Sequence, residues 1–395
     1  MLDSSPIYAS VPASDLQRAK GWYEDKFGFS PVAELGSDRA RNHGRLAQWT
    51  AGLILAVLVA STLAGCSAPR SPGEATPASL ATPATVAPSA TVASSSASPA
   101  ADPNFVSLGG GDVFGDIAAG GGWIWAATVH GLLRVDPTDL TITRYEGIGR
   151  GKFITYAFDS IWVGAARTVA SAETNVVHRI DPENVEVLAT ISVPGMPEGV
   201  AATEDGVWVT QHQTGSISRI DPATNELAET IVVGKEGARG PTDPAAVDGD
   251  IWFGVPNEEV VIRLDPERTA HRHPTPGQPG YGPPTATSEA IWLTNWEDLS
   301  LTRIDRATGE TTFPTPSHAP GGAATAGVNV DDTLWILTDI DMLALDSRSA
   351  EVMATVRLRG GIPRNAVVFD DAVWIMSEFA GSIERIPIDQ LPATE

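Results

Sequence analysis

The 395-residue sequence predicts an all-β fold: a seven-bladed β-propeller of four-stranded antiparallel blades, formed by residues 102–395. Three observations predict it. A motif of the type Arg-Ile-Asp-Pro recurs and weakens only in the last two repeats. Residues 102–395 number 294, or seven periods of 42, and a period of about 40–45 residues is typical of propeller blades. A tryptophan also recurs every 37 to 46 residues, at Trp125, Trp162, Trp208, Trp252, Trp292, Trp335 and Trp374.

Residues 1–38 form the first part of the chain. The pattern predicts a strand at Ile7–Val11 and then an amphipathic helix with Ser14 or Asp15 as its N-cap. This passage resembles the opening βα unit of the glyoxalase/bleomycin-resistance (vicinal oxygen chelate) family in four pairs, Asp15-Leu16, Arg18-Ala19, Trp22-Tyr23 and Gly28-Phe29. The first strand has no metal-ligand histidine and the rest of that fold is missing. We therefore expect a fused fragment, or a translation start placed upstream of the true one, without activity.

Residues 39–66 have the features of a secretory signal. Three arginines precede an apolar run over residues 46–64, and small residues follow. The run Leu63-Ala64-Gly65-Cys66 resembles the bacterial lipobox, which implies lipid attachment at Cys66. Two acyl chains anchor a protein stably, because each buried CH₂ contributes about 0.8 kcal/mol. The alternatives are an uncleaved membrane-spanning helix, since about 18 apolar residues just span a bilayer, and a buried core helix.

Residues 67–101 predict a disordered linker. Of these 35 residues, 29 are Ser, Ala, Pro or Thr, and none is aromatic. Such a segment buries too little apolar surface to offset its ordering entropy. We expect a tether that holds the propeller on the outer face of the cell membrane.

Charge and cysteine content exclude several classes of protein. The net charge is −23, and all of the excess negative charge follows residue 101. Nucleic acid is therefore not a predicted partner, because phosphate binding needs clustered Lys and Arg. Cys66 is the single cysteine, which excludes an intrachain disulfide and a cysteine-based zinc site.

The third repeat shows the expected form of a blade. Its strands are predicted at Gly199–Ala202, Val207–Thr210, Ser216–Ile220 and Leu227–Val233, joined by Asp-Gly and Asp-Pro-Ala-Thr-Asn turns. The seventh repeat ends at Ile383–Ile388 without an outer strand. Residues 104–108 precede the first repeat and read as an outer strand. We expect them to pair with Ile383–Ile388 and close the ring, which removes an open sheet edge.

The repeats, with Ile-Trp-Leu-Thr-Asn and Ser-Ile-Ser-Arg-Ile-Asp-Pro-Ala-Thr, resemble the YVTN/NHL-like propellers and the streptogramin (virginiamycin B) lyase group. The resemblance covers nearly all of residues 102–395. It implies ligand binding near the central channel, on loops that lead into the inner strands or join the second and third strands. The candidate ligand-face residues on these loops are His212, Tyr281, Asn295, Trp296, Glu297, His318, Arg364 and Glu378.

The lyase resemblance implies a catalytic His before the inner strand, a Glu after the second strand of the same repeat, and Mg²⁺. No repeat carries both. Arg364 and Glu378 have the sequence separation expected of the lyase pair. Arginine is not a base near neutral pH, so we expect the two residues to form an ion pair. His271 and His273 alternate on an outer strand and are expected to be surface residues, because a metal pair needs a third ligand.

These observations favour a monomeric, membrane-anchored binding or scaffold module outside the cytoplasm, without predicted catalytic residues or cofactor. Acidic loops leave Ca²⁺ or Mg²⁺ open as bound ions. The predicted partners are membrane lipid through Cys66 and an extracellular protein, peptide or glycan. The alternatives are a streptogramin lyase-like carbon–oxygen lyase and another exported propeller enzyme, such as a quinone- or metal-dependent oxidoreductase.

Overall fold

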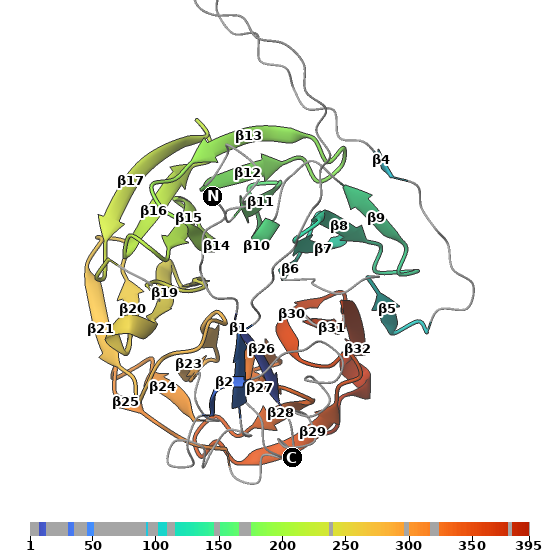
Figure 1. Ribbon diagram of the computed structural model, residues 1–395, viewed down its shortest axis with the longest axis vertical. Coiled ribbons are helices and arrows are strands. Elements are labelled where there is room, and N and C mark those ends of the chain that lie inside the picture. The colour runs from blue at the N-terminus through green and yellow to red at the C-terminus, as the bar shows by residue number, and fades with distance from the viewer. Residues whose placement is uncertain are drawn as a thin grey trace, which may run out of the picture. The chain divides into compact units, whose positions relative to one another are not determined.

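The computed structural model describes residues 102–108, 115–145, 151–165, 175–236, 240–295, 300–316, 324–377 and 381–394, together with four short strands upstream. Seven antiparallel sheets surround a central channel, as Figure 1 shows; six have four strands, and the blade 1 sheet has a short fifth strand at its outer edge. The first three strands of each blade follow the chain order from the channel outward, and so does the fourth except in blade 7, whose outer strand precedes blade 1 in the chain. The predicted seven-bladed β-propeller is confirmed.

The strands are short, as the turn spacing predicts. Blades 1 and 2 contain β6 (Asp116–Gly120), β7 (Trp123–Thr128), β8 (Gly131–Val135), β9 (Ile142–Tyr145), β10 (Gly151–Ala157), β11 (Ser160–Ala165), β12 (Val176–Ile180) and β13 (Val187–Ser192). Blades 3 and 4 contain β14 (Pro197–Thr203), β15 (Gly206–Gln211), β16 (Ser216–Asp221), β17 (Glu226–Val232), β18 (Ala245–Val247), β19 (Asp250–Val255), β20 (Val260–Leu264) and β21 (Ala270–Pro274). Blades 5, 6 and 7 contain β22 (Thr285–Ala286), β23 (Ala290–Thr294), β24 (Leu301–Asp305), β25 (Thr311–Thr312), β26 (Ala324–Val330), β27 (Thr333–Thr338), β28 (Asp341–Leu345), β29 (Val352–Arg357), β30 (Pro363–Phe369), β31 (Ala372–Ser377), β32 (Ser382–Pro387) and β5 (Phe105–Ser107).

Blade 7 is closed by the strand that precedes blade 1. Strand β5 pairs antiparallel with β32, with Val106 opposite Ile383. Arg359 holds this strand from the side: its Nε donates to Glu384 at 3.0 Å, and a terminal nitrogen donates to the Asn104 carbonyl at 3.1 Å. The predicted closing strand is confirmed.

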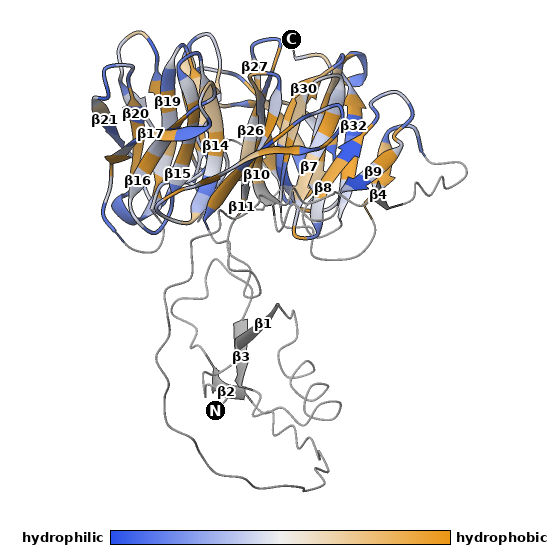
Figure 2. Ribbon diagram, turned by 90° about the horizontal axis from the view of Figure 1, so that it is seen from above, coloured by the Kyte–Doolittle hydropathy of each residue, from blue (hydrophilic) through white to orange (hydrophobic). Residues whose placement is uncertain are grey.

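The recurring tryptophans fill the wedges between blades. The second strands are almost wholly buried, and Figure 2 shows apolar segments on many strands of the ring. Most of the seven indoles are 0–2% exposed, and Trp252 is the most exposed at 7%. In the described part of the chain, five indole N–H groups donate to an oxygen five residues earlier, as Trp162 does to the Ala157 carbonyl at 3.0 Å. This bond satisfies the buried N–H, which would otherwise cost free energy.

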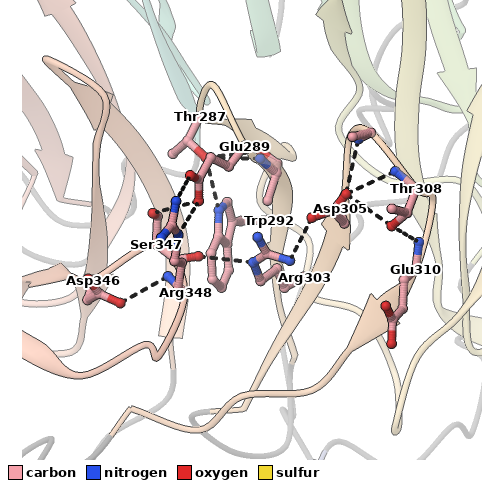
Figure 3. Close-up of polar contacts among 12 residues, drawn as sticks. Thr287, Glu289, Trp292, Arg303, Asp305, Thr308, Glu310, Asp346, Ser347 and Arg348 are labelled. Atoms are coloured by element: carbon pink, nitrogen blue, oxygen red, sulfur yellow. Dashed lines mark hydrogen bonds and ion pairs between the residues drawn. The ribbon is translucent and has the colours of Figure 1, made fainter.

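The second motif is also structural. Its arginine lies over the tryptophan of the same blade, as Arg303 does over Trp292 with 5.6 Å between the guanidinium carbon and the ring centroid. Arg303 also donates to the Ser347 carbonyl of the next blade at 3.0 Å (Figure 3). The motif aspartate caps the following turn: Asp305 accepts the Thr308 main-chain N–H at 2.9 Å. Turns of this kind are typical positions for aspartate.

Three of the upstream strands belong to a separate unit, residues 1–82. Strands β1 (Tyr8–Pro12), β2 (Pro31–Glu34) and β3 (Leu46–Thr50) make a sheet in the order β1-β3-β2. The predicted first strand is thus present, displaced by one residue. The first five residues of the expected signal helix belong instead to β3, where they pair with both neighbours. Residues 51–64, the predicted helix at 14–29 and Cys66 lie outside the described residues.

The predicted linker contains one paired segment. Strand β4 (Val92–Ala93) adds to the outer edge of β9 in blade 1, with Val92 opposite Tyr145. These two residues are therefore ordered, whereas the sequence predicts disorder throughout 67–101. Within the described residues, the structure has no helix that is both long and apolar enough to cross a bilayer.

Candidate binding site at the channel mouth

One face of the ring gathers the starts of the inner strands and the ends of the second strands, because the two are antiparallel neighbours. Pro197, for example, lies opposite Gln211. Charged or polar residues begin the inner strands of several blades at this mouth. They are Asp116 in blade 1, Glu198 in blade 3, Asp243 in blade 4, and Arg364 and Asn365 in blade 7.

An ion pair spans the mouth. A terminal nitrogen of Arg364 lies 3.1 Å from an Asp243 carboxylate oxygen, and the side chains are 15% and 6% exposed. Beside it, the Asn365 amide donates to Asp116 at 2.8 Å, joining blade 7 to blade 1. The Asp116 carboxylate also accepts the Ile117 N–H at 2.8 Å. The mouth is thus cross-linked by polar contacts between blades far apart in sequence.

A cavity of about 520 Å³ extends from the mouth along the inner strands. Asp116, Asp243 and Asn365 line it at the mouth, and Tyr156 and Glu204 line it toward the other end. Burial and the neighbouring Asp159 raise the pKa of the Tyr156 hydroxyl, so Tyr156 stays a neutral hydrogen-bonding group. A cavity of this size with a few convergent polar groups is the usual form of a ligand site.

Blade 3 brings a carboxyl and an imidazole to the mouth. Glu198 is 4% exposed and sits at a β-bulge, where the register of β14 against β15 shifts. His212 follows β15; its N–H donates to the Met196 carbonyl at 3.0 Å. The His212 ring lies 6.1 Å from the Tyr281 ring of blade 5, centroid to centroid. Two of the predicted residues, His212 and Tyr281, are therefore neighbours across the blade 3 and blade 5 loops.

Asn295 has an internal role instead. Its amide donates to Ser300 Oγ at 2.9 Å, and its carbonyl oxygen accepts from Thr302 Oγ1 at 3.2 Å. Gln211 has the same role in blade 3, donating to Ser218 Oγ at 2.6 Å. The residue after the second strand thus supports its own loop in both blades.

Four predicted residues, Trp296, Glu297, His318 and Glu378, lie outside the described residues. The expected pair of Arg364 with Glu378 is therefore untested, and the described partner of Arg364 is Asp243. Asp116 and Asn365 were not predicted. Both lie at the start of an inner strand, in the register position that Gly199 has in blade 3, next to the position of Glu198, and this is the signal by which comparison of the repeats would have found them. Among the described residues, no group of three His, Cys, Asp or Glu side chains is placed to hold a metal ion.

The blades and the polar mouth define a seven-bladed β-propeller protein. Among solved structures, the chain is similar to virginiamycin B lyase from Staphylococcus aureus, with a TM-score of 0.60, 16% identity, and coverage of 72% of this chain and 98% of that one. It is also similar to a streptogramin B lyase (TM-score 0.59, 16% identity, 71% and 97% covered) and to U3-55K (0.57, 11%, 72% and 98%). The predicted resemblance to streptogramin lyase propellers is confirmed for the fold. No protein-family model and no curated protein matches the sequence.

Proposed function

We propose that this propeller is a binding module that receives a ligand at the channel mouth. The proposal rests on the different positions of two groups of residues, those of the repeated motif and the polar residues outside it. The repeated Trp, Arg and Asp side chains are engaged in packing, interblade contacts and turns, whereas the polar residues outside the motif gather above the 520 Å³ cavity. Residues that serve neither core nor turns and converge on a cavity are the usual components of a recognition site.

The charges at the mouth favour a cationic group on the ligand. Three carboxyl groups, those of Asp116, Glu198 and Asp243, face the mouth against one described guanidinium, that of Arg364. Opposite charge near a partly buried site strengthens binding because the local dielectric is low. A peptide that carries lysine side chains has the required chemistry.

The test is calorimetric titration of the full-length chain with trilysine, with triglycine and chitotriose as uncharged probes. Trilysine is expected to bind, and Glu198→Gln is expected to weaken binding about tenfold, which is roughly 1.4 kcal/mol. The matched control is Asp371→Asn, an exposed carboxylate in the turn at the opposite end of the channel. If Glu198→Gln binds trilysine as strongly as the wild type does, or if Glu198→Gln and Asp371→Asn weaken binding equally, the channel mouth is not the binding site.

We further propose that Cys66 carries the lipid that holds the module at the outer face of the membrane. The support is the lipobox-like run that ends at Cys66. Cells fed an alkyne-tagged fatty acid should label the wild-type chain, while Cys66→Ser should be unlabelled and released from the membrane fraction. A labelled Cys66→Ser chain rules this attachment out.

A second candidate function is a carbon–oxygen lyase related to the structural neighbours. One observation favours it: Glu198 lies at the start of β14 and His212 directly follows its neighbour β15, so blade 3 has the two residue types of the lyase pattern at the mouth in exchanged positions. A neighbouring structure is of a catalytically inactive virginiamycin B lyase variant with quinupristin. Incubation of this chain with quinupristin should give a ring-opened product of unchanged mass, lost in His212→Ala. An unaltered substrate, or a product heavier by one water, excludes elimination.

A further inference from the structure

Arginines bridge most of the interblade wedges, and the way they do so is regular. Arg134 of blade 1 donates to the Pro182 carbonyl of the blade 2 turn at 3.2 Å. Arg179 of blade 2 donates to the Pro222 carbonyl of the blade 3 turn at 2.6 Å, and Arg303 reaches the blade 6 turn in the same way. In each case a main-chain carbonyl of the following turn receives a guanidinium that lies over a tryptophan.

The wedge between blades 3 and 4 is bridged in the opposite direction. Arg268 of the blade 4 turn pairs with Asp205 at 2.6 Å and with Glu229 at 3.1 Å, both in blade 3. Its guanidinium carbon lies 4.8 Å from the centroid of Trp208. A guanidinium bonded to both blades thus covers the tryptophan here as well.

In the wedge between blades 4 and 5, Arg306 of blade 5 bonds to Asp248 of blade 4, but among the described residues no guanidinium that bonds to both blades covers Trp252. Arg263 lies over Trp252, 5.9 Å from its centroid, but donates only to Asp250 of its own blade, at 3.3 Å. Its other N–H groups have no acceptor in the described part of the chain, and the side chain is 35% exposed. A guanidinium has five N–H donors in a fixed planar array, so most of its hydrogen-bonding capacity is unused.

The blade 5 turn explains the difference. Arg306 stands where blades 2, 3 and 4 have proline after the motif aspartate. The Arg306 main-chain N–H donates to the Glu289 carbonyl at 2.9 Å, and its guanidinium bonds to the Thr287 carbonyl at 2.8 Å and to Asp248. The turn is therefore tied to the inner half of the wedge, and its carbonyls do not reach Arg263.

A cavity of about 670 Å³, here called the blade 4/5 cleft, lies between the two blades beside Arg263. It is lined by Trp252, Arg263, His271, His273, Asp250 and Ala307. The His273 ring lies 5.5 Å from the Trp252 ring, with 30° between the planes, and gives the cleft a flat aromatic wall. Burial, Arg263 and His271 lower the pKa of the His273 imidazole, so this wall is neutral near pH 7.

We propose that the blade 4/5 cleft binds a turn of a partner polypeptide, one of whose main-chain carbonyls accepts from Arg263. The ligand would occupy the place that the next blade's turn occupies in the wedges between blades 1 and 2, 2 and 3, and 5 and 6. A neutral carbonyl suits the cleft better than a carboxylate, because Asp248, Asp250 and Asp305 also line it and like charges repel. The flat wall of Trp252 and His273 suits the apolar face of a proline-containing turn.

The probe is a cyclised peptide, Asn-Pro-Ala-Thr-Asn-Gly, which copies the turn at 221–225 that receives Arg179, with asparagine in place of the aspartate so that it carries no carboxylate. Binding to the full-length chain is followed through histidine ring signals in NMR spectra, since the chain has seven histidines and two of them line the cleft. The peptide should shift the signals of His271 and His273. Arg263→Ala should weaken binding at least tenfold.

A second variant keeps the test independent of any damage from removing Arg263. Ala307→Trp fills the cleft from an exposed turn position and should also weaken binding tenfold, whereas Ala223→Trp, at an equivalent exposed position in blade 3, should not. Unchanged binding in Ala307→Trp overturns the proposal, as does the absence of shifts at His271 and His273. If sodium acetate produces the same shifts with the same dependence on Arg263, the cleft binds a carboxylate, and the proposal of a polypeptide turn as its ligand is wrong.

Discussion

Arg364 of blade 7 and Asp243 of blade 4 are 121 residues apart in sequence and form an ion pair of 3.1 Å across the channel mouth. Three blade interfaces separate the two residues along the chain between blades 4 and 7. The pair therefore connects opposite sides of the ring directly, through a contact that is independent of the blade-to-blade packing. Asp243 also lines the cavity, so a ligand that binds at the proposed site would contact a residue that stabilises the ring.

Asp243→Asn should be strongly destabilising. The substitution leaves the largely buried Arg364 guanidinium without its carboxylate, and breaking such a pair costs about 3–5 kcal/mol. The free energy of unfolding from urea titration measures the loss. The double variant Asp243→Asn with Arg364→Gln should lose less than the sum of the single losses; strict additivity would show that the two side chains act independently. Arg348→Gln, which removes an exposed pair with Glu289, should leave the urea midpoint unchanged.

Leu108→Ala should destabilise the whole ring. Leu108 is 1% exposed and packs with Trp374 and Ile383 beside the closing strand. Removing such a side chain from a core costs about 2–5 kcal/mol. The thermal midpoint should fall, with the transition remaining single. Val232→Ala, at a side chain that is 74% exposed, serves as the matched control, and an equal effect of the two substitutions would refute closure by this segment.

Arg179→Ala and Arg263→Ala should differ although the two arginines occupy equivalent motif positions. Arg179 donates to Ser160, Pro222 and Asn225, the last two in the next blade, whereas Arg263 donates to Asp250 alone. Loss of several hydrogen bonds to a charged group costs about 1.5–3 kcal/mol for each bond left unmade. Chemical denaturation should show the larger loss for Arg179→Ala. Equal losses would contradict the difference in contacts between Arg179 and Arg263.

The stability of the fold should depend on His273 in mildly acidic solution. Its pKa in the folded chain is held below the ordinary 6.5 by burial and by the nearby Arg263 and His271. The unfolded chain therefore binds the proton more readily, so this contribution is full above pH 6.5 and is lost as the pH falls toward the lower, folded-state value. Thermal midpoints measured from pH 8 to pH 5 should fall less steeply for His273→Phe. Parallel curves for the two proteins would contradict a depressed pKa.

The repeats made most of the fold predictable. Five of the seven blades repeat one arrangement of Trp, Arg and Asp, and the other two keep the Trp, so the register of blade 3 and the missing outer strand of blade 7 both followed from the spacing. The contacts at the channel mouth were harder to predict, because the partner of Arg364 depends on how far its side chain reaches across the channel. Asn295 was predicted as a ligand-face residue, but its side chain hydrogen-bonds to Ser300 and Thr302 and supports its own loop. The two-residue strand of Val92–Ala93 depends on an edge offered by β9, which composition does not reveal.

Strand β5 has a consequence for the order of events during synthesis. It is made before the first blade, whereas its partner β32 is the last strand of the ring. Every blade must therefore leave the ribosome, and in an exported chain cross the membrane, before this pair is able to form. Contacts between such distant parts of a chain form slowly, so the nascent propeller remains an open ring with an unpaired edge until its final residues arrive. An unpaired strand edge is a template for pairing with other chains, so the nascent protein is exposed to aggregation for the whole of this interval.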